Sequence, residues 1–183
     1  MAKVYAMVAD GSEEVELLAV VDILRRSGIE TVLVSVNDTK TTVSSHKVKM
    51  DADAVIAETD FSDGDVIFLP GGLPGAENLS NCEPLIAAVR QALAEGRRVA
   101  AICAAPGVVL GRHGFLEGKT ATCYPGFENE FQGAEYTMQG VVTDGSITTA
   151  RGLGFAIDLG LELVRLLDSE EKAEDTRKKI QYS

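Results

Sequence analysis

Tryptophan is absent from this 183-residue sequence, and histidine and cysteine are scarce. The three cysteines, Cys82, Cys103 and Cys123, are odd in number, widely spaced and without a CxxC pair. A disulfide scaffold is therefore not expected in a chain of this size. The two histidines, His46 and His113, form no cluster with cysteine at the spacing of metal ligands, so we expect no metal site.

Basic residues are also few. Lys and Arg number 17 against 28 Asp and Glu, which gives a formal net charge of −11 and a pI of about 4.6. Because affinity for phosphate groups depends on Lys and Arg, no stable nucleic-acid complex is expected. An anionic membrane surface is disfavoured for the same reason.

Long apolar runs are missing as well. No run approaches the roughly 18 residues that a membrane-spanning helix needs. The apolar stretch over residues 4–9 is short and lacks a small-residue cleavage pattern, so it predicts a first strand and not a signal peptide. We expect no membrane association and a cytoplasmic location.

The residues that are present indicate one α/β domain over residues 1–183. Hydrophobic residues make up 45% of the chain and charged residues 25%, an ordinary globular balance. Continuous apolar runs predict strands that are buried on both faces, and helical spacings between them predict covering helices. We expect these strands over residues 4–9, 31–36, 65–69 and 98–102, and helices over 13–27, 84–95, 106–110, 155–167 and 169–180.

Several less regular segments complete the prediction. Residues 41–50 predict a strand or hairpin away from the main sheet, and short strands are expected over 120–123, 136–139 and 141–149, the last with a tight turn at Asp144 and Gly145. Alternating strands and helices with short loops predict a mainly parallel sheet with helices on both faces. Ligands bind at the carboxyl ends of such strands, so loops 10–16, 70–75 and 103–107 should meet at one edge.

Cys103 is the first candidate for chemistry. It follows a buried strand and precedes a helix, where backbone N–H groups and the helix dipole favour a thiolate and lower the pKa of a thiol. The small neighbours Ala104, Ala105 and Gly107 permit a sharp elbow that leaves the sulfur reachable. A buried structural cysteine is the alternative, since free cysteines commonly lie in cores. Cys82 and Cys123 lack this setting.

The loop over residues 70–75 contains three glycines and two prolines. Glycine permits unusual backbone angles and close approach of a ligand. Successive N–H groups of this loop, with that of Ala104, could form an oxyanion hole. An ordinary turn is the alternative. The loop gains interest because its strand should neighbour the one that carries Cys103.

Glu16 is the third candidate. Glu13 and Glu14 occupy a first helical turn, after a capping residue in the turn 10–12, and offset the helix dipole without further function. Glu16 shares an apolar stripe with Val20 and Ile23, so its pKa should rise unless a polar group partners it. A protonated Glu16 could donate a hydrogen bond to a Cys103 thiolate or act as a general acid and base. The alternative is a carboxylate at the stripe edge that reaches water.

Two other patterns are weaker. Neither His46 nor His113 is adjacent to Cys103 in sequence, so a Cys-His pair receives no local support. Residues 114–120 end like a phosphate-binding P-loop, but the glycine spacing is one residue short and the segment precedes a strand. A turn is the better interpretation of this segment.

Three motifs in the same order resemble the ThiJ/PfpI superfamily. They are the segments Gly11 to Glu16, Leu69 to Gly72 and Ala101 to Pro106. The resemblance extends from the first strand to about Leu167, and it is nearest to the Parkinson-linked deglycase branch and its bacterial counterpart YajL.

The resemblance implies a flavodoxin-like, class I glutamine amidotransferase-like three-layer sandwich and a homodimer. It implies that Cys103 is a nucleophile and a redox-sensitive thiol, that Glu16 is its partner carboxylate, and that Gly72 and Ala104 supply N–H donors. Relatives with protease-like or chaperone-like chemistry place histidine directly after the cysteine, where this chain has Ala104. Some close relatives carry a histidine where this chain has Tyr124, which leaves a proton-transfer role open here.

The branch implies a cofactor-independent hydrolase that repairs methylglyoxal and glyoxal adducts on proteins and nucleotides. Glyoxalase activity on the free aldehyde would use the same residues. A redox-switched chaperone or stress sensor acting through Cys103 oxidation is an alternative of another class, and a structural dimer without catalysis is a third.

Overall fold

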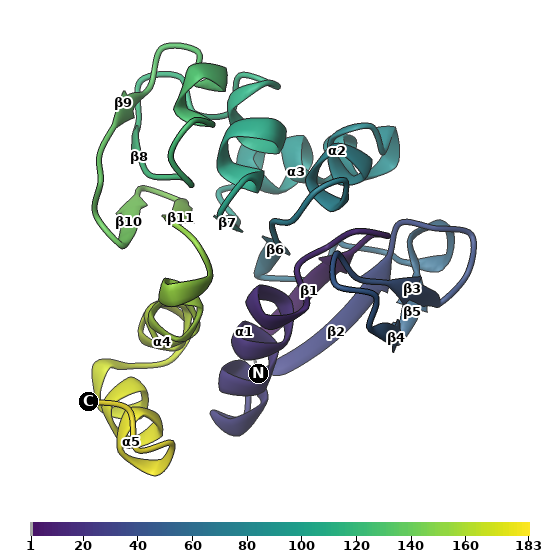
Figure 1. Cartoon of the computed structure of the whole chain (residues 1–183). Coiled ribbons are helices and arrows are strands. Elements are labelled where there is room, and N and C mark those ends of the chain that lie inside the picture. Colours follow the sequence, from purple (N-terminus) through teal and green to yellow (C-terminus); the bar gives the residue numbers. More distant parts are fainter. Residues whose placement is uncertain (1) are drawn as a thin grey trace.

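A seven-stranded sheet forms the centre of the computed structural model, which describes residues 2–183 (Figure 1). All neighbouring strands are parallel except the pair at one edge, which is the hairpin expected around Asp144 and Gly145. From that edge to the other the strands are β10 (Val141–Asp144), β11 (Ile147–Ala150), β7 (Arg98–Ile102), β6 (Val66–Leu69), β1 (Lys3–Val8), β2 (Glu30–Ser35) and β5 (Ala54–Val55).

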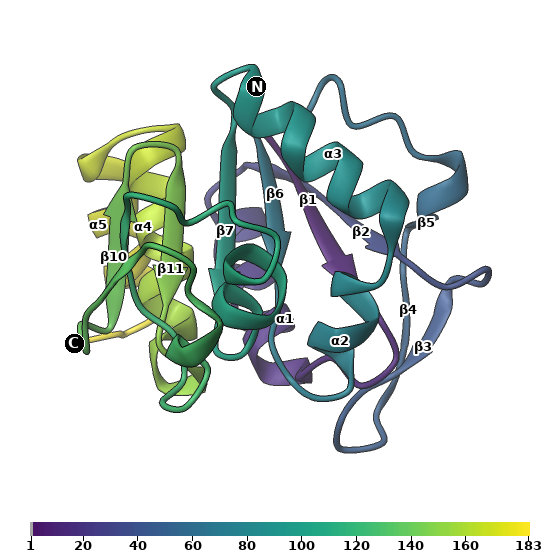
Figure 2. The same cartoon turned by 90° about the horizontal axis from the view of Figure 1, so that it is seen from above.

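Helices cover both faces of the sheet (Figure 2). One face carries α1 (Glu14–Arg26), α4 (Ala156–Leu167) and α5 (Glu170–Lys179). The other carries α2 (Gly75–Ser80), α3 (Glu83–Ala94) and a π-helix, η2 (Pro106–Gly111). The predicted flavodoxin-like three-layer architecture is confirmed.

Alternation along β1 explains why its sequence is a continuous apolar run. Val4, Ala6 and Val8 point into the core beneath α1 and α4. Tyr5 and Met7 point to the opposite core, which lies beneath α3 and η2. Both sets are almost fully buried. Because each large apolar side chain contributes about 1.5–3 kcal/mol when buried, both faces of this strand stabilise the sheet.

Helix α1 presents one apolar face to the sheet and to α4. Its crossing with α4 is close because Gly160 has no side chain, and a Cβ there would lie 2.9 Å from the Cβ of Ile23. The helix begins differently from the prediction. Its capping residue is Glu13, whose Oε2 accepts a hydrogen bond from Glu16 N at 2.7 Å. The Ser12 hydroxyl instead accepts a hydrogen bond from Ala9 N, which holds the preceding turn.

The smallest elements differ most from the sequence predictions. Residues 41–50 do form a hairpin away from the main sheet, with strands β3 (Thr41–Val43) and β4 (Lys49–Asp51). Strand β5, helix α2 and the 3-10 helix η1 (Ile56–Glu58) were not predicted, since segments of two to six residues carry almost no periodic signal.

The region between η2 and β10 is mostly loop. Residues 112–118, which include most of the P-loop-like pattern, form turns, as expected. The strands predicted here are reduced to a short parallel pair. The pair consists of β8 (Thr120–Ala121) and β9 (Glu135–Tyr136), and the 3-10 helix η3 (Glu128–Glu130) lies between them in sequence. A further 3-10 helix, η4 (Leu153–Phe155), follows β11. Within residues 2–183, no helix combines the length and apolar character needed to cross a bilayer.

Candidate active site

The three loops expected to share one edge do meet there. Gly71, after β6, lies between the side chain of Cys103, after β7, and that of Glu16, in the first turn of α1. A Cβ added at Gly71 would lie 2.6 Å from Cys103 Cβ and 2.6 Å from Glu16 Oε2. The thiol and the carboxyl group are therefore neighbours across a residue that must be glycine.

Cys103 occupies a sharp elbow. Its φ of 63° lies in the left-handed region, which is uncommon for a residue with a side chain. The elbow is held from both sides, since Cys103 N donates to Ala150 O at 2.9 Å and Tyr124 N donates to Cys103 O at 2.8 Å. The π-helix η2 follows three residues later, and both features are concentrated at functional sites in proteins. The cysteine as a whole is only partly buried.

Glu16 is 1% exposed, which excludes the alternative of a carboxylate that reaches water. Its Oε2 accepts a hydrogen bond from Gly71 N at 3.0 Å. Burial raises the pKa of Glu16 to about 7, and the negative charge of Glu13 adds to this rise. Hydrogen bonds with Cys103 and with the backbone of Gly71 and Leu153 oppose it. A carboxyl group with this pKa can take up and release a proton near neutral pH.

The pKa of Cys103 corrects the sequence prediction. Helix-end donors were expected to lower it, but burial raises the pKa of this thiol to about 12, and the charge and hydrogen bonding of Glu16 raise it too. The N–H groups of Ala104 and Gly72 act in the opposite direction. Two negative charges cannot share this buried space, so a thiolate forms here together with a protonated Glu16. The position of Cys103 in the sequence indicated the donors but not the burial or the neighbouring charge.

The two backbone donors expected from the sequence, Gly72 and Ala104, lie beside the sulfur. Gly72 has a φ of 85°, and a Cβ there would lie 2.5 Å from Glu13 N, so glycine is required. Gly71 was not singled out from the sequence, although its N–H holds Glu16. The glycine-rich loop indicated close approach without revealing which N–H faces which group.

The other residues considered from the sequence lie outside this pair. Cys123 is fully buried, and burial raises its pKa to about 12. Cys82 precedes α3, and burial raises its pKa as well. The His113 ring hydrogen-bonds with Ser80 at 3.1 Å. Within the described residues 2–183, none of these three side chains forms a hydrogen bond with Cys103 or Glu16.

Tyr124 lies beside the site and contacts Cys103 through its backbone. Its N–H holds the Cys103 carbonyl, while its side chain is 53% exposed. It lines an open cavity of about 420 Å³ together with Pro125 and residues 151–155. This cavity adjoins the pair, because the backbone of Leu153, in its wall, lies close enough to Glu16 to lower the pKa of the carboxyl group. A small carbonyl compound or the end of a longer substrate fits a cavity of this size.

Comparison with known proteins identifies the family of the chain. Residues 2–166 match the model of the DJ-1/PfpI family. Protein DJ-1 homolog B of Arabidopsis thaliana is 41% identical over 172 residues, which cover 93% of this chain and 39% of the plant protein. The chain thus spans about two fifths of the length of that relative. Protein dj-1beta of Drosophila melanogaster is 33% identical over 175 residues, which cover 94% of this chain and 92% of the fly protein.

The solved structures give the same result. The oxidized DJ-1 of Toxoplasma gondii superposes with a TM-score of 0.97 at 37% sequence identity, over 100% of both chains. A matching family model over nine tenths of the sequence, similar relatives and this superposition together assign the protein: the chain belongs to the DJ-1/PfpI family.

Proposed function

We propose that the protein is a cofactor-independent cysteine hydrolase that repairs methylglyoxal- and glyoxal-glycated proteins and nucleotides, within the stress-related role of DJ-1 proteins. The observation that carries the proposal is the pair of a partly buried Cys103 and a buried Glu16, which has two backbone donors at the sulfur and an open cavity beside it. A carboxyl group that titrates near neutral pH next to a thiol is the arrangement that nucleophilic catalysis needs.

In the proposed reaction the Cys103 thiol gives its proton to Glu16, and the sulfur forms a bond to the former aldehyde carbon of the adduct as the bond from that carbon to the amine or thiol breaks. The N–H groups of Gly72 and Ala104 stabilise the oxygen that becomes anionic. Glu16 returns a proton to the amine or thiol that leaves. Hydrogen transfer between the two adjacent carbons oxidises one and reduces the other, so no external oxidant is needed. The transfer leaves a thioester on Cys103, and water cleaves its C–S bond, which restores the thiol and releases lactate from a methylglyoxal adduct or glycolate from a glyoxal adduct.

A glyoxalase reaction on the free aldehyde uses the same groups. The glutathione-independent glyoxalase DJR-1.2 of Caenorhabditis elegans is 27% identical to this chain over 173 residues, which supports this second candidate. The redox-sensor and chaperone alternative rests on the partial exposure of Cys103, which contrasts with the full burial of Cys123.

The proposal includes a homodimer in the cytoplasm, where thiols are kept reduced. Helix α1 supports the dimer, because Val15 and Leu18 lie three residues apart on it and are 48% and 43% exposed. Apolar side chains on one exposed helix face are typical of an interface. Light scattering of the wild-type chain and of a Val15→Asp variant tests this part.

The test of the reaction compares the wild type with Cys103→Ala and with Cys123→Ala as a matched control. Purified methylglyoxal-treated peptide is the substrate, and lactate release under reducing conditions is measured. We expect Cys103→Ala to lose at least about a thousandfold in rate, whereas Cys123→Ala keeps it. Full activity of Cys103→Ala at unchanged thermal stability would exclude the proposed mechanism.

A second version of the experiment distinguishes the deglycase, glyoxalase and redox-sensor functions. An excess of an aldehyde-trapping amine removes free methylglyoxal, so lactate release continues for a deglycase and stops for a glyoxalase. The sensor alternative predicts no turnover in either arm. It predicts instead that peroxide treatment changes the suppression of aggregation in the wild type and not in Cys103→Ala.

A further inference from the structure

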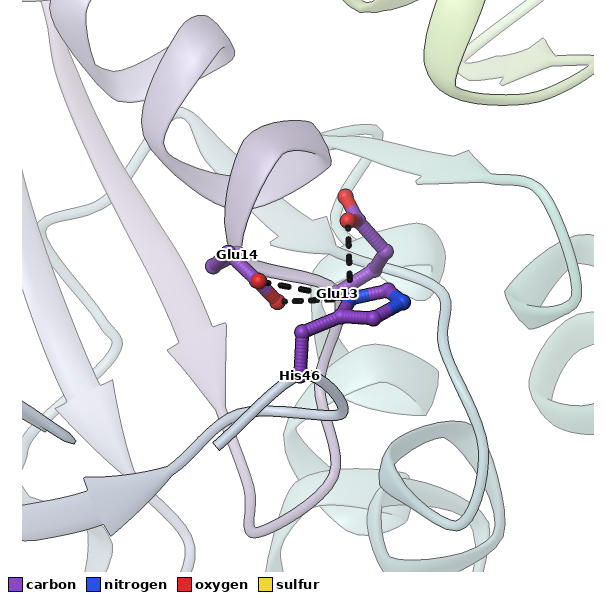
Figure 3. A group of neighbouring side chains, drawn as sticks. All are labelled: Glu13, Glu14 and His46. Atoms are coloured by element: carbon purple, nitrogen blue, oxygen red, sulfur yellow. Dashed lines mark hydrogen bonds and ion pairs between the residues drawn. The ribbon is translucent and has the colours of Figure 1, made fainter. Parts of the chain in front are cut away.

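A second group of side chains lies at the start of α1, away from the thiol. His46, in the loop between β3 and β4, points toward Glu13 and Glu14 (Figure 3). His46 Nδ1 lies 3.3 Å from Glu14 Oε1 and 3.7 Å from Glu13 Oε1. These residues are about 32 positions apart in sequence, which is why spacing alone indicated no ligand cluster. We propose that Glu13, Glu14 and His46 form a binding site for one zinc-class divalent cation.

The two carboxylates are unusually enclosed for groups without a strong cationic partner. Their side chains are 10% and 14% exposed, whereas that of His46 is 70% exposed. Within residues 2–183, no Lys or Arg forms an ion pair with either of them, and His46 is their basic neighbour. Enclosed carboxylates normally have a paired charge or a metal ion. A bound cation would add the full positive charge that hydrogen bonds and the helix end supply to these carboxylates only in part.

One oxygen of Glu13 is free to act as a ligand. Its Oε2 is occupied by the hydrogen bond from Glu16 N. Its Oε1 accepts no hydrogen bond from the described part of the chain and faces His46 Nδ1. Glu13 as a whole is 8% exposed, so this is a nearly buried oxygen directed into the group.

The distances suit a small tetrahedral ion. Ligands about 2.1 Å from zinc lie about 3.4 Å from one another in tetrahedral geometry. The distances of 3.3 and 3.7 Å to Nδ1 are close to that value, and the three ligand atoms all lie within 4.8 Å of one another. The open side of His46 leaves room for water as a fourth ligand.

The ligand types select the class of cation. One imidazole nitrogen with two carboxylate oxygens suits zinc and similar transition metals, whereas calcium and magnesium prefer oxygen alone. Ser45 contributes from outside the ligand set. Its hydroxyl lies 3.4 Å from Glu14 Oε2, so it can orient that carboxylate, and it would turn away from His46 Nδ1, now at 3.2 Å, when an ion binds there. The positive end of α1 opposes a cation with about half an elementary charge, which two carboxylates exceed.

Calorimetric titration of the reduced wild-type chain with Zn²⁺, in a buffer free of chelators and phosphate, tests the site. We expect one ion to bind per chain, and His46→Gln and Glu14→Gln each to weaken this binding at least about tenfold. His113→Gln is the matched control for a histidine and should bind as the wild type does. Far-ultraviolet circular dichroism and thermal melting establish that each variant is folded.

Zinc also binds thiols, so a separate experiment tests whether the sulfur of Cys103 binds the ion. Cys103→Ser should retain the ion that His46→Gln loses. Co²⁺ in place of zinc should give visible d–d bands without a sulfur charge-transfer band, and those bands should vanish in His46→Gln. Equal affinity in the wild type, His46→Gln and Glu14→Gln, or loss of all binding in Cys103→Ser, would overturn the proposal.

Discussion

Two carboxylates on the same side of the sheet experience opposite surroundings. Glu162, in α4, accepts two hydrogen bonds of 2.7 Å from Arg165 and one of 2.8 Å from Thr143. Hydrogen bonding with Arg165 is the main reason that the pKa of Glu162 is lowered. Glu16, in α1, faces a thiol, backbone N–H groups and another carboxylate, and its pKa is raised to about 7.

The difference separates a group that stabilises the fold from one that is held ready for chemistry. Glu162 is ionised and paired, so its charge favours the folded state. The ionised form of Glu16 has no cation to offset its burial, so the folded state is less stable whenever Glu16 is charged. Loss of stability at such a residue is common where a protein keeps a perturbed group for reaction.

Filling the space between Glu16 and Cys103 should have the largest effect on the surroundings that distinguish Glu16 from Glu162. Gly71→Ala places a methyl group 2.6 Å from both side chains and 2.9 Å from Ile102 O. We expect a loss of about 3 kcal/mol or more in the free energy of unfolding. Lactate release should fall at least about a hundredfold, because the two groups are forced apart. Urea unfolding and the lactate assay measure these effects.

Gly154→Ala is the control for this prediction. A Cβ at Gly154 meets nothing within 4 Å, and its φ lies outside the left-handed region, so stability should stay within about 0.5 kcal/mol. If Gly71→Ala were as stable as Gly154→Ala, the close packing of Glu16 and Cys103 would be disproved.

Glu16→Gln should sharpen the comparison between Glu16 and Glu162 by changing how the stability of the fold depends on pH. The folded-state pKa of Glu16 is raised from 4.5 to about 7, so the wild type loses stability as pH rises from about 4.5 to 7. Glutamine cannot ionise and can still accept the hydrogen bond from Gly71 N. At pH 8 the variant should therefore be more stable than the wild type by as much as about 3 kcal/mol. At pH 4 the two should be nearly equal, and chemical unfolding across this range checks the sign.

Glu162→Gln should show the opposite sign and a smaller effect. The folded-state pKa of Glu162 is lowered, so its contribution is present above its ordinary pKa of 4.5 and is lost as pH falls through the folded value. The side chain of Arg165 is 41% exposed, which limits the pair to about 1 kcal/mol. The variant should be less stable than the wild type at pH 7 and similar to it near pH 3. A stabilised Glu162→Gln at pH 7 would contradict the assignment.

The parts of the fold that sequence could predict are those with a strong periodic signal. Strand β7 and the ends of α3 and α4 lie within one residue of their predicted places, because each is a long apolar or amphipathic run. Strand β5 and helix α2 were not predicted, since they are held by neighbouring elements and not by their own pattern.

The candidate site was predictable as a set of loops but not as a set of interactions. Topology brings Cys103, Gly72 and Glu16 to one edge, and this follows from the strand order alone. The direction of the Cys103 pKa and the role of Gly71 depend on burial and on which atoms face one another. The approach of His46 to Glu13 and Glu14 depends on a hairpin outside the main sheet, whose path no local pattern determines.

The left-handed backbone of Cys103 has a consequence for protein engineering. A non-glycine residue in this conformation is disfavoured by about 1–2 kcal/mol relative to the right-handed form, and glycine would relieve that disadvantage. Replacements that are branched at Cβ, such as valine or threonine, would meet the greatest steric resistance. A library of substitutions at position 103, ranked only by melting temperature, should therefore favour glycine over cysteine, and stability selection by itself would remove the thiol.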